Sequence, residues 1–301
     1  MPKLQWIACL VLAATAAPNL SAEARCPGNV SSVPYRVVNR HQMVVPVSIN
    51  HSGPYPFLFD TGTQMTMIDP ALASQLQLSL DGQANVASAG VNASASYSQI
   101  ERVELDSHAV SSLKVLVYDL ANLQAGGLNV RGVLGEDFLE RFDVLIDNAH
   151  SLLCLDDSGA MRAEVKGERV PLADLPSEGT LAKSLVVSVK LSDGMRPVRL
   201  KLDSGANVPF LYNTSEYMAL GAFRGASLRG GGANHAPQAF EALPPQNMKV
   251  GRAELSRVQF VTLAGAQKNS HTSEFDGLLT LGLFRRVFID HANRAVVLDP
   301  M

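Results

Sequence analysis

The chain has 301 residues, of which 47% are hydrophobic and 18% are charged, and its formal net charge at pH 7 is -3. This length suffices for two domains of ordinary size, each able to bury its own core. The weak negative charge excludes a strongly basic nucleic-acid-binding surface, and the hydrophobic content excludes a disordered chain.

The N-terminal residues are typical of a secretory signal peptide. Lys3 precedes an apolar run from Leu4 to Ala17, and Ala22-Glu23-Ala24 offers a cleavage site with small residues. Because a spanning helix needs about 20 apolar residues, this run is too short to favour a membrane anchor. We therefore expect that residues 1–24 are removed and that the protein is exported, either to the periplasm or out of the cell, without membrane attachment.

Two cysteines remain once that segment is removed. Cys9 lies within it, whereas Cys26 and Cys154 belong to the mature chain. In an oxidising compartment this pair would form one disulfide between the N-terminal arm and the end of the first half. The alternative is two buried free thiols, because a sequence does not establish whether two cysteines are within reach of each other.

An alternating segment predicts a β-hairpin early in the mature chain. Met43–Asn50 alternates as a strand, residues 51–54 form a turn, and Tyr55–Phe59 returns toward Asp60. We therefore expect Asp60 to lie directly after the second strand of this hairpin.

Further elements are expected in the first half. Met67–Pro70 predicts a short strand, and Ala71–Leu78 predicts a short helix. The Gly- and Ser-rich residues 87–98 have strand-like flanks, which predict a mobile hairpin tip. Glu136 and Asp137 are expected in a solvated loop.

The polar residues 156–179 contain several glycines and prolines and predict the boundary between two lobes. After this boundary Leu185–Leu191 and Val198–Leu202 predict another hairpin, which ends at Asp203. The remaining elements repeat the first half in the same order: a short strand at 208–212, a short helix at 215–220 and a hairpin around 230–240.

The residues that follow the two hairpins are duplicated as well. Asp60-Thr61-Gly62 recurs 143 residues later as Asp203-Ser204-Gly205. A single tripeptide of this kind would be an ordinary turn, because Asp and Gly are common turn residues. Two copies, each between apolar segments, indicate an internal duplication that provides two carboxyl groups in equivalent settings.

This arrangement resembles the aspartic peptidases, in which each half of the molecule contributes one Asp from an Asp-Thr-Gly or Asp-Ser-Gly loop. The later segments are similar too: Gly132–Gly135 and Phe142–Asp147 in the first half, and Gly277–Gly282 and Val287–Asp290 in the second. The closer likeness is to retroviral-type (retropepsin-like) domains, two in tandem on one chain. The resemblance implies an all-β fold with short helices, built from two pseudo-symmetric β-barrel lobes with an active-site cleft between them. The expected lobes are residues 25–157 and 181–301, joined by a linker at 158–180.

The resemblance also implies an aspartic endopeptidase with Asp60 and Asp203 as its catalytic pair. Peptide hydrolysis needs a base that activates water and an acid that protonates the departing nitrogen. Two carboxyls about 3 Å apart can supply both functions, because they share one proton and titrate in two separate steps. The expected substrate is a polypeptide, cofactor and metal are expected to be absent, and the protein is expected to be a monomer whose lobes pair within the chain.

Six neighbouring residues are expected to support this pair: Thr61, Gly62, Thr63, Ser204, Gly205 and Ala206. The glycines let the backbone pass close to the carboxyls. The hydroxyls of Thr61 and Ser204 resemble those that bond across to the opposite loop in the family. A hydroxyl at Thr63 can favour the charged form of the adjacent carboxyl, whereas Ala206 cannot. This difference predicts an asymmetric pair in which Asp60 ionises more readily, with activity on the acid side of neutral.

The family likeness places a flap over the substrate at the first hairpin tip. Gly90 and Tyr97 are candidates for this flap and for the cleft, and Gly231 is the candidate in the second half. For Tyr97 the alternative is an aromatic residue that simply packs on a sheet.

One other functional class, an inactive binding module, remains as an alternative, and several classes of enzyme lack support in the sequence. A duplicated β fold can retain its Asp loops as turns and serve as a catalytically inactive, exported binding or inhibitor module. A glycosidase with two carboxylates would need aromatic sugar platforms, but the single tryptophan, Trp6, lies in the leader. The sequence contains no zinc-peptidase or serine-hydrolase motif.

Overall fold

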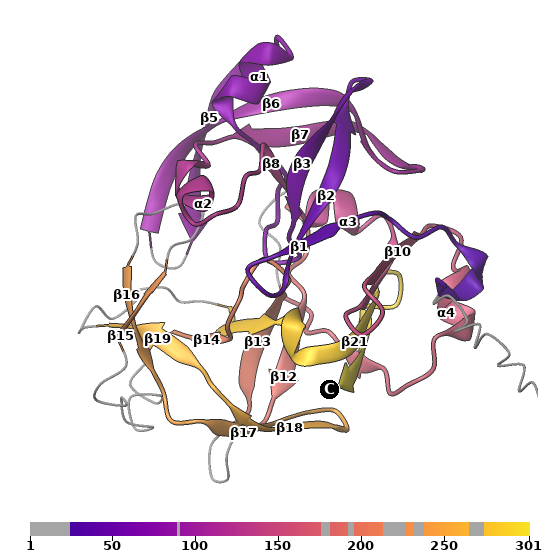
Figure 1. Ribbon diagram of the computed structural model, residues 1–301, viewed down its shortest axis with the longest axis vertical. Helices are drawn as coiled ribbons and strands as arrows, with labels where there is room; N and C mark the ends of the chain where they lie inside the picture. Colours follow the sequence, from indigo (N-terminus) through magenta and orange to yellow (C-terminus); the bar gives the residue numbers. More distant parts are fainter. Residues whose placement is uncertain are drawn as a thin grey trace, which may run out of the picture.

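The computed structural model describes residues 25–88, 91–175, 181–191, 196–212, 227–230, 238–264 and 274–301. The expected signal peptide and the expected helix at 215–220 lie outside these ranges. The fold is mainly β with short helices, which confirms the expected class. In Figure 1 the first half of the chain lies above the second half.

The first half forms an eight-stranded sheet that closes on itself. Its strand order is β1-β2-β3-β8-β4-β7-β6-β5, and β2 pairs additionally with β6. This second pairing, between Val47–Ile49 and Val103–Leu105, bends the sheet into a barrel-like lobe. The strands are β1 (Arg36–Val38), β2 (Gln42–Ile49), β3 (Ser52–Phe59), β4 (Met67–Ile68), β5 (Leu80–Ser88), β6 (Val91–Leu105), β7 (His108–Val117) and β8 (Gly132–Leu134).

The second half repeats this plan with a seven-stranded sheet and a separate hairpin. The sheet has the order β12-β13-β20-β14-β19-β16-β15, and β17 pairs with β18. The strands are β12 (Val186–Val189), β13 (Val198–Asp203), β14 (Phe210–Leu211), β15 (Ser227–Gly230), β16 (Gln238–Ala242), β17 (Gln246–Val250), β18 (Ala253–Val258), β19 (Val261–Leu263) and β20 (Gly277–Thr280).

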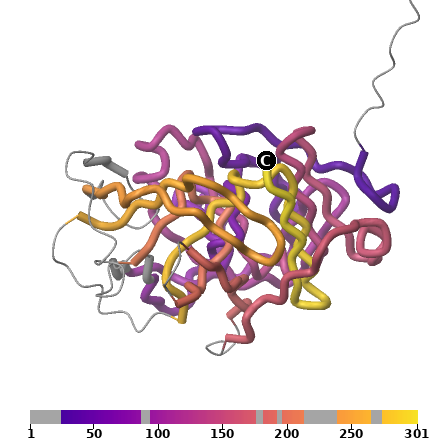
Figure 2. The backbone as a smooth tube through the Cα atoms, turned by 90° about the horizontal axis from the view of Figure 1, so that it is seen from below, coloured from indigo at the N-terminus to yellow at the C-terminus, as the bar shows by residue number. Residues whose placement is uncertain are grey.

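A third sheet is shared by the two halves. Its order is β10-β9-β21-β22-β11, so strands from both halves pair directly at β9 and β21. Figure 2 shows the yellow C-terminal strands running beside strands of the first half. The strands are β9 (Asp143–Asp147), β10 (Leu152–Asp156), β11 (Val170–Pro171), β21 (Phe284–Asp290) and β22 (Ala295–Pro300).

The helices are short and lie between strands. They are η1 (Pro27–Asn29), α1 (Pro70–Gln75), α2 (Ala121–Ala125), α3 (Glu136–Leu139), α4 (Ala160–Glu164) and η3 (Leu281–Leu283). Within the described residues no helix is long and apolar enough to cross a membrane. The segment expected as a linker contains α4 and β11, and β11 adds to the edge of the shared sheet.

Local chemistry explains two boundaries that differ from the sequence expectation. The first hairpin turns at Asn50 and His51, whose φ angles are 49° and 64°, so β3 begins earlier than predicted. Asn tolerates this left-handed region better than most residues. Helix α1 begins after Asp69, whose carboxylate accepts a hydrogen bond from the Leu72 amide at 2.6 Å. It ends at Gln75 rather than continuing to Leu78.

The prediction of a solvated loop at Glu136 and Asp137 is wrong. Both residues lie in the first turn of α3, and Glu136 is 0% exposed. Its carboxylate contacts the ring of His291, a residue of the second half, with 3.0 Å between Oε2 and Nε2. Charged residues suggest a solvated loop because they are usually exposed. Here the ion pair with His291 of the other half allows Glu136 to be buried.

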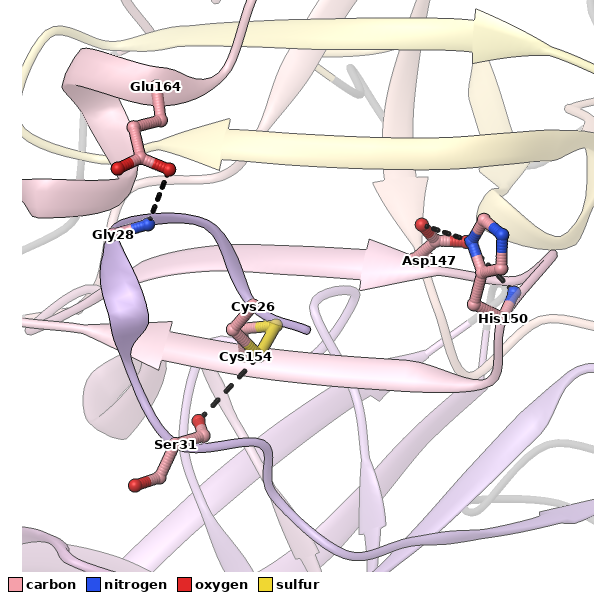
Figure 3. Close-up of a disulfide and its surroundings, with 7 residues drawn as sticks. All are labelled: Cys26, Gly28, Ser31, Asp147, His150, Cys154 and Glu164. Carbon is pink, nitrogen blue, oxygen red and sulfur yellow. Dashed lines mark hydrogen bonds and ion pairs between the residues drawn. A yellow bond between two sulfur atoms is a disulfide. The ribbon is translucent and has the colours of Figure 1, made fainter. Parts of the chain in front are cut away.

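The predicted disulfide is present. Cys26 and Cys154 are joined, with 5.9 Å between their Cα atoms (Figure 3). The arm is also held by Gly28, whose amide donates to Glu164 Oε2 at 2.8 Å. The dashed line from the disulfide to Ser31 marks a contact of 3.7 Å; it is no ordinary hydrogen bond, because a disulfide sulfur carries no proton. The N-terminal arm is therefore fixed to the outer strand of the shared sheet.

Candidate active site

Asp60 and Asp203 occupy equivalent positions at the ends of two strands. Strand β3 pairs in parallel with β8, and the Asp60 amide donates to the Leu134 carbonyl at 3.0 Å. Strand β13 pairs in parallel with β20, so that Asp203 lies opposite Thr280. Each Asp is thus held beside the end of a neighbouring strand of its own lobe.

Hydrogen bonds between the two Asp loops lock these strand ends together. The Thr61 amide donates to Ser204 Oγ at 3.1 Å, and the Ser204 amide donates to Thr61 Oγ1 at 3.1 Å. Each hydroxyl also donates onward across the junction, Thr61 Oγ1 to the Leu202 carbonyl at 3.2 Å and Ser204 Oγ to the Phe59 carbonyl at 2.8 Å. Because Thr61 and Ser204 are 0% and 3% exposed, these four bonds are shielded from competing water.

The glycine of each loop lies against the carboxyl group of the other loop. A Cβ built on Gly62 would lie 2.4 Å from Cγ of Asp203, and one built on Gly205 would lie 2.7 Å from Cγ of Asp60. No side chain fits at either position without displacing a carboxyl. The proximity of Asp60 is also one cause of the raised pKa of Asp203. The fold therefore brings together two carboxyls whose residues are 143 positions apart in the sequence.

The two carboxyls differ in their hydrogen-bond donors. Asp60 accepts bonds from the Gly62 amide at 2.8 Å and from Thr63 Oγ1 at 2.7 Å. Asp203 accepts one from the Ala206 amide at 2.8 Å. Burial and the adjacent charge of Asp60 raise the pKa of Asp203 to about 8. The raised pKa favours the protonated form of Asp203 at neutral and acid pH. The asymmetry expected from the difference between Thr63 and Ala206 stays a prediction.

Side-chain amides add a second set of contacts between the lobes, which the sequence analysis did not foresee. Gln42 donates to the Gly205 carbonyl at 2.6 Å and accepts from Asn207 Nδ2 at 3.2 Å. In the other direction Gln64 donates to the Ala182 carbonyl at 2.8 Å. Gln64 and Asn207 are both the fourth residue after their Asp, so each loop reaches the entry segment of the opposite lobe. Their equal offset in the sequence was the signal that could have identified them.

Of the three flap and cleft candidates, only Tyr97 lies within the described residues. Strands β5 and β6 form the expected hairpin, but Gly90 at its tip and Gly231 in the second half lie outside the described residues. Tyr97 lies on β6, where its ring packs on the N-terminal core and stands 3.9 Å from Lys114 Nζ. These contacts correspond to the alternative reading of Tyr97, an aromatic residue packed on a sheet.

No group of three or more His, Cys, Asp or Glu side chains in the described ranges could hold a metal ion. The groups described around Asp60 and Asp203 are the two carboxyls, backbone amides and hydroxyls.

The sequence and the fold were compared with known proteins. A family model described as aspartyl protease matches residues 45–138. Among solved structures, the aspartic proteinase from Irpex lacteus matches with a TM-score of 0.53 and 13% identity, over 90% of this chain and 97% of that chain. No curated protein matches the sequence significantly.

The family match shows that residues 45–138 are similar to aspartyl proteases. These matched residues include the Asp60 loop but not the Asp203 loop. At 13% identity the structural match shows the fold alone, but it extends over both halves.

Proposed function

We propose that the protein is an aspartic endopeptidase that hydrolyses peptide bonds with a water held between Asp60 and Asp203. The observation that supports this most directly is the packing of Gly62 on Asp203 and of Gly205 on Asp60, which places each carboxyl against the Asp loop of the other half. Paired carboxyls with one shared proton are suited to acid and base catalysis on a single water.

In this mechanism the two residues begin in different protonation states. Asp60, with its hydrogen bonds from Gly62 and Thr63, is the carboxylate that removes a proton from the water. Asp203, whose pKa is raised to about 8, is the acid that donates to the carbonyl oxygen of the scissile bond. As the C–N bond of the tetrahedral intermediate breaks, Asp60 passes its proton to the departing nitrogen. Asp203 takes back a proton from a hydroxyl of the gem-diol, which becomes the product carboxyl group, so the pair again holds one proton.

The proposed mechanism also requires that the backbone hold the two carboxyls at a fixed separation. Catalysis by two carboxyls depends on their separation, and a displacement of 1 Å can reduce a rate about 100-fold. The four hydrogen bonds between Thr61 and Ser204 and the opposite strands tie the lobes at this point. We propose on this basis that the two retropepsin-like lobes of one chain, 25–157 and 181–301, pair with each other and that the protein acts as an exported monomer.

The proposal is tested by digestion of a denatured protein between pH 3 and pH 8. We expect cleavage by the wild type, loss of cleavage in both Asp60→Asn and Asp203→Asn, and inhibition by a statine-type compound. Asp174→Asn is the matched control, because this carboxylate is 88% exposed and lies outside both loops. It should cleave like the wild type.

The alternative is a catalytically inactive binding or inhibitor module with the same fold. Cleavage that persists in Asp60→Asn or Asp203→Asn would point to a contaminating peptidase. Absence of cleavage by a folded wild-type protein over the whole pH range would favour the inactive module.

A further inference from the structure

A buried lysine lies beside the two carboxyls. Lys201 is on β13, two residues before Asp203, and only 6% of it is exposed. Lysine is seldom buried to this extent without a partner, because its ammonium group loses hydration. No carboxylate in the described part of the chain lies within ion-pair distance of this ammonium group.

Lys201 and Asp203 project from the same face of β13. Side chains alternate along a strand, so residues two apart share a face and are separated by about 7 Å. Leu200 and Leu202 project from the opposite face and belong to the main hydrophobic core. The ammonium group therefore lies on the side of the sheet that carries the catalytic carboxyl, next to it along the strand.

The equivalent residue in the first half is apolar. Leu58 lies two residues before Asp60, is 3% exposed and packs in an apolar cluster with Met67 and Val133. The duplicated fold thus places a leucine beside one carboxyl and a lysine beside the other. The two sides of the proposed dyad differ in charge at the same structural position.

The surroundings of Lys201 satisfy its side chain only in part. Its Nζ atom stands 5.4 Å from the centre of the Phe275 ring, and this ring packs against Tyr212 with 6.0 Å between centroids. Burial lowers the pKa of Lys201, and the negative charges of four carboxylates oppose this shift: Asp203, Asp60, Glu136 and Glu274. These charges act from beyond ion-pair distance, so they offset the lost hydration without occupying the hydrogen-bond positions of the ammonium group.

We propose that Lys201 is a specificity-determining residue that binds a carboxylate of the substrate, so that the enzyme prefers peptides with an acidic residue on one side of the scissile bond. This inference rests on the proposed function, because it assumes that the peptide crosses the dyad. A peptide bound there has one flanking residue near Leu58 and the other near Lys201. The residue near Leu58 is expected to be apolar, and the residue near Lys201 is expected to be Asp or Glu.

Lys201 also offsets the electrostatic repulsion between the dyad and an acidic substrate. The dyad carries one negative charge in its active form, and this charge would repel a nearby substrate carboxylate. A positive charge beside Asp203 compensates it and supplies the hydrogen bonds of a charge-assisted pair.

The test uses four fluorogenic peptides that are identical except at the two residues flanking the scissile bond. One flank holds Leu, and the other holds Glu or Gln; the second pair of peptides exchanges the flanks. We expect the wild type to favour Glu over Gln about tenfold in kcat/KM, the effect of one charge-assisted hydrogen bond. The preference should occur on one flank only and should disappear below about pH 4, where the substrate Glu is protonated.

Two variants test whether Lys201 causes the preference for Glu over Gln. In Lys201→Met the ratio of kcat/KM for Glu over Gln should fall below 1, because the dyad charge is no longer compensated. The matched control Lys249→Met removes a lysine whose side chain is 52% exposed on β17, and it should leave the ratio as in the wild type. A wild type that cleaves Glu and Gln peptides equally at both flanks would overturn the inference, and so would a ratio unchanged by Lys201→Met.

The wild-type comparison requires no variant to fold, so the inference stays testable even if Lys201→Met is unstable. Failure of the proposed function gives a different result. In that case none of the four peptides, nor any apolar peptide, would be cleaved.

Discussion

Gly62 lies so close to Asp203 that a Cβ at this glycine would stand 2.4 Å from the carboxyl carbon. The contact joins the first Asp loop to the second and is repeated in the opposite direction by Gly205 and Asp60. Glycine is therefore required at these positions by the other lobe rather than by its own turn.

Gly62→Ala should abolish most of the activity while leaving the protein folded. The added methyl group displaces the Asp203 carboxyl, which is a side-chain end and moves more easily than the backbone. A shift of about 1 Å is expected to lower kcat about 100-fold. The control is Gly126→Ala, where the nearest atoms to a new Cβ are backbone oxygens at 3.3 Å and 3.5 Å in the turn that ends α2. A Gly62→Ala enzyme with wild-type kcat would contradict the geometry described above.

The pH profile of activity should have its upper limit near the raised pKa of Asp203. This residue must carry the proton, so kcat/KM is expected to fall as the pH rises through about 8, the pKa of Asp203. Ala206→Ser places a hydroxyl where the first half has Thr63 and should move this limit to lower pH, because a donor favours the charged form. Thr63→Val removes the hydroxyl that donates to Asp60 at 2.7 Å and should lower kcat, because the carboxyl loses one of its two described hydrogen bonds. Profiles that coincide for the wild type and Ala206→Ser would argue against an asymmetric pair.

The buried pair of Glu136 and His291 should make stability depend on pH. Burial by itself lowers the pKa of His291, but the charge of Glu136 and the hydrogen bonds that the ring donates to Glu136 and to the Phe142 carbonyl outweigh it, so the pKa is raised. A raised pKa in the folded state contributes stability that is complete below about 6.5, the value of an unfolded histidine, and is lost as the pH rises through the folded value. The free energy of unfolding, measured by urea denaturation, should therefore decrease above about pH 6.5.

Glu136→Gln should remove this dependence and lower the free energy of unfolding by about 3 kcal/mol, since it breaks a buried ion pair. Asp147→Asn is the matched control, because Asp147 and His150 form an ion pair of similar length, 2.9 Å, in which the histidine is 57% exposed. Exposed pairs contribute at most about 1 kcal/mol. Equal losses in the two variants would show that burial of Glu136 has no special effect.

Removal of the disulfide should destabilise the chain without altering the active site. Cys26→Ser with Cys154→Ser opens a loop of 128 residues and should lower the free energy of unfolding by about 2–5 kcal/mol. The peptidase activity of the folded variant should match that of the wild type. A reducing agent should shift the unfolding midpoint of the wild type toward that of the variant and leave the variant unaffected. A midpoint insensitive to reduction in both proteins would indicate that the cysteines are not joined in solution.

The duplicated pattern predicts two halves with one plan and the position of the two Asp loops, and the family resemblance that it carries implied the fold class. Apolar alternation predicts strands, and the equal spacing of Asp60 and Asp203 from Asp147 and Asp290 predicts two halves with one plan. These features are local, because strand formation and turn chemistry depend on residues close together in the sequence. The predicted strands before Asp60 and Asp203 are present as β3 and β13.

Only the tertiary structure decided which residues meet across the two halves. Glu136 reads as a solvated charge until His291 is placed against it, and Gln42 has no visible role until the Gly205 loop lies beside it. The physical reason is that desolvation and pairing of polar groups depend on contacts between residues more than 100 positions apart, which no local pattern encodes.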